Sequence, residues 1–81
     1  MVDDPAVRAR EIRAHHEDRL GRTVAALDGQ PRNGYVVSLA LFPGDLPPSL
    51  RRFATAESLA HLERLVRDGR AERDGAGYVR A

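Results

Sequence analysis

The stretch from residue 55 to residue 80 most limits how this chain can fold, because it combines an amphipathic helix with a hairpin. The helix is expected over residues 50–68, and its apolar residues recur at i, i+3 and i+7 in one stripe: Leu59, Leu62 and Val66, flanked by Leu65 and Ser58. Gly69 follows this stripe and can adopt the left-handed conformation that ends a helix. Residues 70–80 are typical of two short antiparallel strands around a glycine-rich turn. A helix that runs directly into a hairpin indicates the second half of a winged helix.

Size and composition exclude several classes of protein. The chain has 81 residues, so residues 1–81 are expected to form one small domain with one core. It contains no cysteine, which excludes disulfides and thiolate metal sites, and no apolar run long enough to span a membrane. Nothing at the N-terminus resembles a signal peptide, and the expected compartment is the cytoplasm. The formal net charge of +1 gives no support for a strongly acidic partner.

A first helix is expected over residues 5–28. Asp4 can cap its free N–H groups, and Pro5 suits the first helical position because proline has no N–H to lose. One face of this helix is predicted to point inward: Ala9, Ile12, His16, Leu20, Thr23, Val24 and Leu27. His16 is expected to be a hydrogen-bonded residue at the edge of the core.

A second helix is expected over residues 34–42, with Asn33 as its cap after a short extended piece. Its inward face is predicted to consist of residues at i, i+4 and i+7: Tyr35, Leu39 and Phe42. Ser49 can cap the third helix, which Leu50 to Phe53 either join or precede as a turn. The resulting order predicts a mostly α-helical, winged helix-turn-helix domain, with three helices and a two- to three-stranded sheet.

Four segments carry a resemblance to a known family: REIRAHHEDRL at residues 10–20, QPR at 30–32, LFP at 41–43, and AHLERL at 60–65 followed by DGR at 68–70. Together they resemble the C-terminal winged-helix domain of metallo-β-lactamase-fold hydrolases, a glyoxalase-II-like group. The most specific matches are the His-x-x-x-Arg of helix one, at His15 and Arg19, and the His-Leu pair at His61 and Leu62. The chain departs from the family at His16, where an arginine is common, and at Val36, where an acidic residue often completes a capping box.

The resemblance implies a chain without its own catalytic centre. In that family the zinc ligands lie in a preceding catalytic domain, and its His-x-His-x-Asp-His motif is absent from this sequence. Residues 1–5 resemble the linker that leaves such a domain, so the chain is expected to be part of a larger zinc-dependent hydrolase, although a free-standing product is an alternative. The expected role is a non-catalytic module that packs on the catalytic domain and shapes its substrate entrance. The substrate of such an enzyme cannot be read from these residues.

Candidate interface residues lie on the first and third helices: His15, Arg19, Phe53, Ala56, Ala60 and Arg64. On helix three, Phe53, Ala56 and Ala60 form a second apolar stripe, which suggests a docking surface for the catalytic domain or for a second copy of the chain. Alternatively, the alanines are simply good helix formers, and Phe53 folds back onto helix two. No metal-binding or catalytic residue is predicted, because adjacent His15 and His16 point in different directions and no nucleophile has a base beside it.

Nucleic-acid binding is the main alternative function, because winged helices commonly insert their third helix into the major groove. Five arginines are the candidates for such contacts: Arg51, Arg52, Arg70, Arg73 and Arg80. The outward side of helix three carries nearly balanced charges, however, and Glu63 and Arg67 are spaced to pair with each other. The sequence therefore favours a protein partner over DNA or RNA.

Overall fold

The computed structural model describes residues 4–81 as three helices followed by a two-stranded antiparallel sheet. The elements are, in chain order, α1 (Pro5–Ala25), α2 (Gly34–Leu41), α3 (Pro48–Arg67), β1 (Ala71–Asp74) and β2 (Gly77–Arg80). This arrangement confirms the mostly helical fold class with a small hairpin. The proposed linker at residues 1–5 lies partly outside the described residues, and its last two residues, Asp4 and Pro5, begin α1.

Local signals start and end the helices largely as expected. The Asp4 carboxylate accepts a hydrogen bond from the Ala6 N–H at 2.9 Å, and the Asn33 side chain accepts one from the Val36 N–H at 2.9 Å. Gly69 adopts a φ of 75° after α3, as its position predicted. The cap predicted for α3 is wrong: the helix begins at Pro48, Pro47 precedes it without a side-chain cap, and Ser49 already lies inside the first turn.

The core lies where α2, α3 and the end of α1 meet the hairpin. Its buried residues come from all of these elements: Leu20, Leu27, Val37, Leu41, Leu62, Leu65, Ala71 and Tyr78. Thr23, Ser38 and Ser58 are buried as well, and each donates its hydroxyl to a carbonyl one helical turn earlier. These three buried hydroxyl groups are therefore hydrogen-bonded within their own helices.

The predicted inward face of α3 is rotated relative to the observed one. The buried residues are Ala54, Ser58, Leu62 and Leu65, whereas Val66 is only partly buried and Leu59 is 39 % exposed. The small residues Ala54 and Ser58 let α2 approach α3 closely, which turns the larger Leu59 outward. Leu59 still covers the start of α2, because a Cβ added at Gly34 would lie 2.5 Å from its Cγ.

The predicted inward face of α2 is also wrong. Tyr35 and Leu39 are exposed and Phe42 is partly buried, while the helix buries a different set: Gly34, Val37, Ser38 and Leu41. The physical reason lies again in the contact with α3, which needs small or compact residues at the positions of closest approach. The exposed Tyr35 and Leu39 form part of the outer surface instead.

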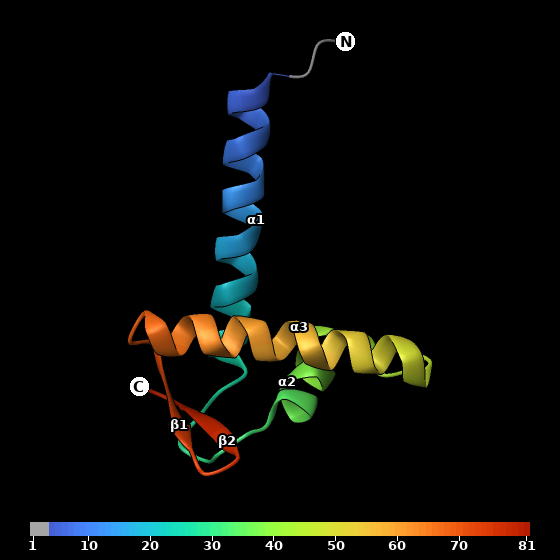
Figure 1. Ribbon diagram of the computed structural model, residues 1–81, viewed down its shortest axis with the longest axis vertical. Coiled ribbons are helices and arrows are strands. Elements are labelled where there is room, and N and C mark those ends of the chain that lie inside the picture. The colour runs from blue at the N-terminus through green and yellow to red at the C-terminus, as the bar shows by residue number, and fades with distance from the viewer. Residues whose placement is uncertain (1–3) are drawn as a thin grey trace.

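The first helix enters the core only with its last turns. All residues from Asp4 to Asp18 are exposed. Figure 1 shows this part of α1 projecting away from α3 and from the rest of the domain. The prediction that Ala9, Ile12 and His16 face the core is therefore wrong. Ile12 is 50 % exposed, and His16 is an exposed side chain and not a core-edge residue. The apolar periodicity of α1 continues past the point where the helix leaves the other elements of this domain.

The hairpin packs against the segment between α1 and α2. Its two strands pair from Ala71 with Arg80 to Asp74 with Gly77. Arg32 adds a third, isolated pairing, since its N–H donates to the Tyr78 carbonyl at 3.0 Å and its carbonyl accepts from the Tyr78 N–H at 2.9 Å. A side chain at Gly77 would collide with this segment, 2.9 Å from the Arg32 nitrogen. The expected extended piece is thus confirmed.

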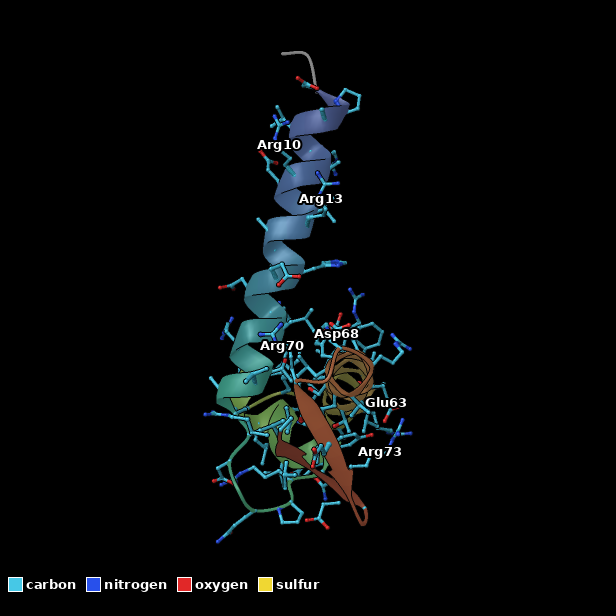
Figure 2. The ribbon with its side chains drawn as sticks, turned by 90° about the vertical axis from the view of Figure 1, so that its left-hand side faces the viewer. Arg10, Arg13, Glu63, Asp68, Arg70 and Arg73 are labelled. Carbon is cyan, nitrogen blue, oxygen red and sulfur yellow. The ribbon has the colours of Figure 1, made fainter. Side chains whose placement is uncertain are left out.

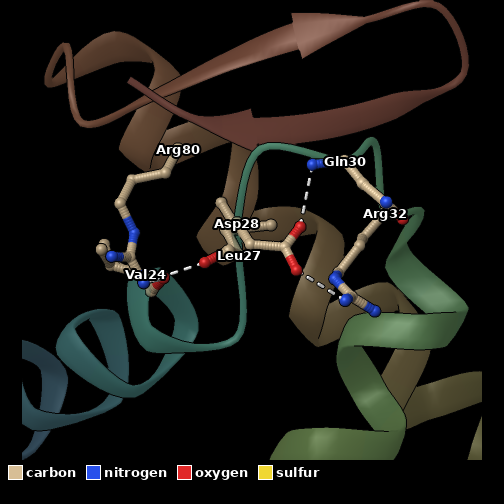
Figure 3. A network of polar contacts seen from close by, with 6 residues as sticks. All are labelled: Val24, Leu27, Asp28, Gln30, Arg32 and Arg80. Carbon is tan, nitrogen blue, oxygen red and sulfur yellow. Dashed lines mark hydrogen bonds and ion pairs between the residues drawn. The ribbon is translucent and has the colours of Figure 1, made fainter.

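Polar contacts hold the same segment in place, as Figure 3 shows. The Asp28 carboxylate accepts hydrogen bonds from the Gln30 N–H at 2.9 Å and from the Arg32 guanidinium at 2.8 Å. Arg80 at the end of β2 donates to the carbonyls of Val24 and Leu27, at 3.1 Å and 2.8 Å. Arg80 thereby joins the last strand to the Val24 carbonyl in the last turn of α1 and to the Leu27 carbonyl just beyond the helix.

Within residues 4–81, no helix is both long and apolar enough to cross a membrane.

Candidate functional site

A groove lies in the corner between the projecting part of α1 and the C-terminal half of α3. We call it the α1–α3 groove, and it encloses about 410 Å³. Four residues of α1 and four of α3 line it: Arg13, His16, Glu17, Leu20, Ala60, His61, Arg64 and Arg67. Its walls therefore carry three arginines and two histidines against one carboxylate.

The arginines of the α1–α3 groove differ in how far they are already paired. Arg64 forms an ion pair with Asp68, its Nε lying 3.0 Å from the Asp68 Oδ2. Arg13 and Arg67 take part in none of the ion pairs formed within residues 4–81. Loss of hydration lowers the pKa of His61, and the nearby Arg19 and His16 lower it further, although Glu57 acts in the opposite direction. The α1–α3 groove therefore holds two guanidinium groups, those of Arg13 and Arg67, that form none of these ion pairs.

A second groove lies between α2 and α3 and is mostly apolar. It encloses about 530 Å³ and is lined by residues from both helices: Tyr35, Pro48, Arg51, Arg52, Thr55, Ala56 and Leu59. Arg51 closes one side of it, because its guanidinium donates to the Ser38 carbonyl at 3.0 Å and to the Pro43 carbonyl. This guanidinium therefore ties α3 to the end of α2.

The six interface candidates do not form one compact cluster. Phe53, Ala56 and Ala60 are all exposed on α3, and the side chain of Phe53 is 70 % exposed, so it does not fold back onto α2. Ala56 lines the α2–α3 groove, whereas Ala60 and Arg64 line the α1–α3 groove. The outward stripe of α3 is therefore a ridge between the two grooves.

The remaining two interface candidates, His15 and Arg19, lie on α1. His15 is exposed on the projecting part of the helix. Arg19 is partly buried, and its guanidinium carbon lies 5.1 Å from the centre of the Phe42 ring. This contact stacks a cation on an aromatic face and connects α1 with the end of α2.

Three of the five arginines proposed for nucleic-acid contact have partners within the domain. Arg51 holds the end of α2, and Arg80 holds the end of α1. Arg73 forms an ion pair with Glu63, which also accepts a hydrogen bond from the Tyr78 hydroxyl. Arg52 and Arg70 are exposed. The hairpin arginines thus serve mainly to hold the hairpin, which leaves few of them to contact phosphates.

The Glu63 contacts also correct an expected pair. Glu63 was predicted to pair with Arg67 on the same helix, but its carboxylate binds Arg73 of the hairpin, and Figure 2 shows these two side chains close together. Hydrogen bonds from Arg73 and Tyr78 lower the pKa of Glu63. The same contact raises the pKa of Tyr78. A long-range pair therefore takes the place of a helical one and attaches the hairpin to α3.

The residues present do not fit a metal site. Within the part of the chain that the structure describes, no three histidine, aspartate or glutamate side chains are grouped so that they could hold a metal ion. His16 and His61 line the same groove, but a structural or catalytic zinc ion requires at least three protein ligands.

These features define a small helical domain with a hairpin and with surface grooves on both sides of the ridge on α3. Residues 20–80 match the family described as the metallo-beta-lactamase-like, C-terminal domain, and the chain belongs to this family. The chain is also similar to the crystal structure of a beta-lactamase domain protein from Burkholderia ambifaria, with 30 % identity and a TM-score of 0.78. That match covers 93 % of this chain and 24 % of the other, so this chain spans about a quarter of that protein's length. No curated protein matches the chain.

Sequence reasoning missed three residues of the α1–α3 groove, Arg13, Glu17 and Arg67. Arg13, His16 and Leu20 recur at i, i+3 and i+7, so their shared face could have been found. The opposing wall could not, because only the packing of α1 on α3 brings Arg67 near that face.

Proposed function

We propose that this chain is a non-catalytic module of a metal-dependent hydrolase that packs on a metallo-β-lactamase-fold catalytic domain and helps to shape its substrate entrance. The observation that carries the proposal is the projecting part of α1, in which every residue from Asp4 to Asp18 is exposed. The family match supports a module of such a protein. Zinc, the expected metal, would be held by residues of the catalytic domain.

The projecting helix needs a partner to be stable. Isolated helices of about 12–15 residues or fewer are marginal in water, and residues 5–18 are a segment of that length. The match to the Burkholderia ambifaria protein leaves out only 7 % of this chain, so it extends over most of the projecting part. A similar helix is therefore present in a chain that is about four times as long, which favours a further domain as the partner.

The ridge on α3 supports the same interpretation. Phe53, 70 % exposed, is the largest side chain of the ridge, and Ala56 and Ala60 beside it allow another backbone to approach closely. Because the ridge and the projecting part of α1 enclose a corner, a domain that covers both would have the α1–α3 groove at its border. This position would allow the module to line a substrate entrance.

Nucleic-acid binding has less support, because three of its five candidate arginines hold the domain together. A second copy of the chain as partner and a cytoplasmic location remain predictions.

The proposal can be tested in two steps. The reading frame upstream of the codon for Met1 is expected to encode a His-x-His-x-Asp-His motif. In the full-length enzyme, Ile12→Glu and Phe53→Glu are each expected to lower activity about tenfold or more, since a charge buried in an apolar interface is costly. The matched control is Ala40→Glu, at an exposed position of α2.

The melting temperature of the isolated domain separates docking from folding. It should change little in both variants, because Ile12 and Phe53 are exposed in this chain. Full activity of both variants would rule out the docking surface. An upstream frame without the motif would rule out the proposed parent enzyme.

A further inference from the structure

Positive charge converges on the α1–α3 groove from two different helices. Arg13 and His16 come from α1, and His61, Arg64 and Arg67 come from α3. Figure 2 shows Arg13 on the side of α1 toward α3, whereas Arg10, one turn earlier, points to the other side and does not line the groove. Glu17 is the one carboxylate among the residues that line the groove, so basic side chains outnumber acidic ones there.

Residues outside the groove offset only part of this charge, since Asp68 pairs with Arg64 and Glu57 acts on His61. Asp68 is engaged by Arg64, and Glu63, which is within electrostatic range of Arg67, is bound by Arg73 and Tyr78. Arg13 and Arg67 thus keep their guanidinium groups available on opposite walls, within the limits of residues 4–81.

We infer that the α1–α3 groove binds a phosphate-type dianion. Arginine guanidinium groups donate paired N–H groups to phosphate oxygens, and two walls of donors suit a tetrahedral anion better than a planar carboxylate. His16 and His61 can donate from their ring nitrogens, and Leu20 and Ala60 provide an apolar floor between them. A volume of about 410 Å³ is sufficient for a phosphate group and part of the molecule that carries it.

This inference deepens the proposed function, on which it rests for the origin of the anion: the groove would hold the phosphate of a substrate at the border of the catalytic domain. Binding itself requires only the residues of this chain. It can therefore be measured without the catalytic domain, and its failure is distinguishable from a failure of docking, which the Ile12 and Phe53 variants report.

The test is an NMR titration of the ¹⁵N-labelled 81-residue chain with sodium pyrophosphate at neutral pH and constant ionic strength. Saturable shifts are expected at the amides that border the groove, including those of Arg13, His61 and Arg67. The double variant Arg13→Gln, Arg67→Gln should bind about tenfold more weakly, equivalent to about 1.4 kcal/mol. Arg10→Gln, the matched control on the same helix, should bind less than about twofold more weakly, because its charge lies outside the groove.

The results separate the possible outcomes. Shifts that do not saturate, shifts spread over all basic residues, or equal losses in the double variant and in Arg10→Gln would overturn the inference. A parallel titration with a short single-stranded RNA identifies the source of the phosphate. Binding of RNA more than about tenfold tighter, with the same dependence on Arg13 and Arg67, assigns the groove to a nucleic-acid backbone. Equal or weaker binding of RNA assigns it to a small phosphorylated molecule.

Discussion

Several arginine side chains that lie at the surface of this domain hold its elements together. Arg51 and Arg80 donate to carbonyls at the ends of α2 and α1, and Arg73 of the hairpin pairs with Glu63 of α3. Each of these contacts joins two different elements of the domain. Arginine is suited to this use because its planar guanidinium reaches several acceptors at once. The arginines that remain for binding are therefore fewer than the 13 in the sequence.

The contact of Glu63 should make the stability of the domain depend on pH in the acidic range. The pKa of Glu63 is lower in the folded chain than in the unfolded chain, mainly because of Arg73 and then Tyr78. Its contribution is therefore complete above the unfolded pKa of about 4.3 and is lost as the pH falls through the folded pKa. In melting curves recorded from neutral to acidic pH, Glu63→Gln should show a smaller acid-induced loss of stability than the wild type.

Glu72→Gln is the matched control for this experiment. Glu72 lies exposed on β1 of the same hairpin and takes part in none of the ion pairs within residues 4–81. Its variant should keep the pH dependence of the wild type. Parallel pH profiles for wild type and Glu63→Gln would contradict the role assigned to this carboxylate.

Among the elements, α1 is the one with two distinct environments. Its last turns contribute Leu20 and Thr23 to the core, while residues 4–18 contact solvent. The family match begins at residue 20, close to the point where the helix enters the core. This point on α1 thus separates the turns that contribute to the core from the exposed turns.

The amides of the projecting part of α1 should exchange rapidly in the isolated chain. Without tertiary contacts, residues 8–18 depend on helix propensity and on the Asp4 cap, which hold a segment of this length only marginally. Hydrogen exchange followed by NMR should show the amides of Leu62 and Leu65 exchanging at least about 100-fold more slowly than those of residues 8–18. Equal protection along α1 and α3 would show that the projecting part is stable without a partner.

At the scale of the whole molecule, the domain is elongated, and its longest dimension, 48 Å, includes the projecting helix. The net charge of +1 conceals a local excess of arginine in the corner between α1 and α3. The chain belongs to the metallo-beta-lactamase-like, C-terminal domain family, yet residues 4–81 contain no group of side chains that could hold a metal ion. The distribution of residues in space, and not the composition, therefore determines what this domain can bind.

The isolated chain should not be stabilised by zinc. A structural metal contributes to folding only where its ligands are grouped, and His16 and His61 have no third ligand with them in the described residues. The melting temperature is expected to be the same with stoichiometric zinc and with a chelator. A rise with zinc that disappears in His16→Gln, His61→Gln would reveal a metal site in the α1–α3 groove.

The sequence by itself determined the order and the approximate bounds of the elements. Asp4 with Pro5, Asn33 and Gly69 act on backbone groups within a few residues, so their effect does not depend on the rest of the fold. The extended piece beside the hairpin and the family were predicted from similarly local patterns.

Only the tertiary structure decided which face of each helix is buried. Leu59, Tyr35, Leu39 and Ile12 were expected inside, but each is exposed. Periodicity shows which apolar residues share one face of a helix, but it does not show which element packs against that face. Where α2 and α3 approach closely, small residues such as Ala54 and Ser58 take the core positions, and where α1 extends past the domain none of the residues 4–81 covers it. Burial depends on the neighbouring elements, which local patterns do not contain.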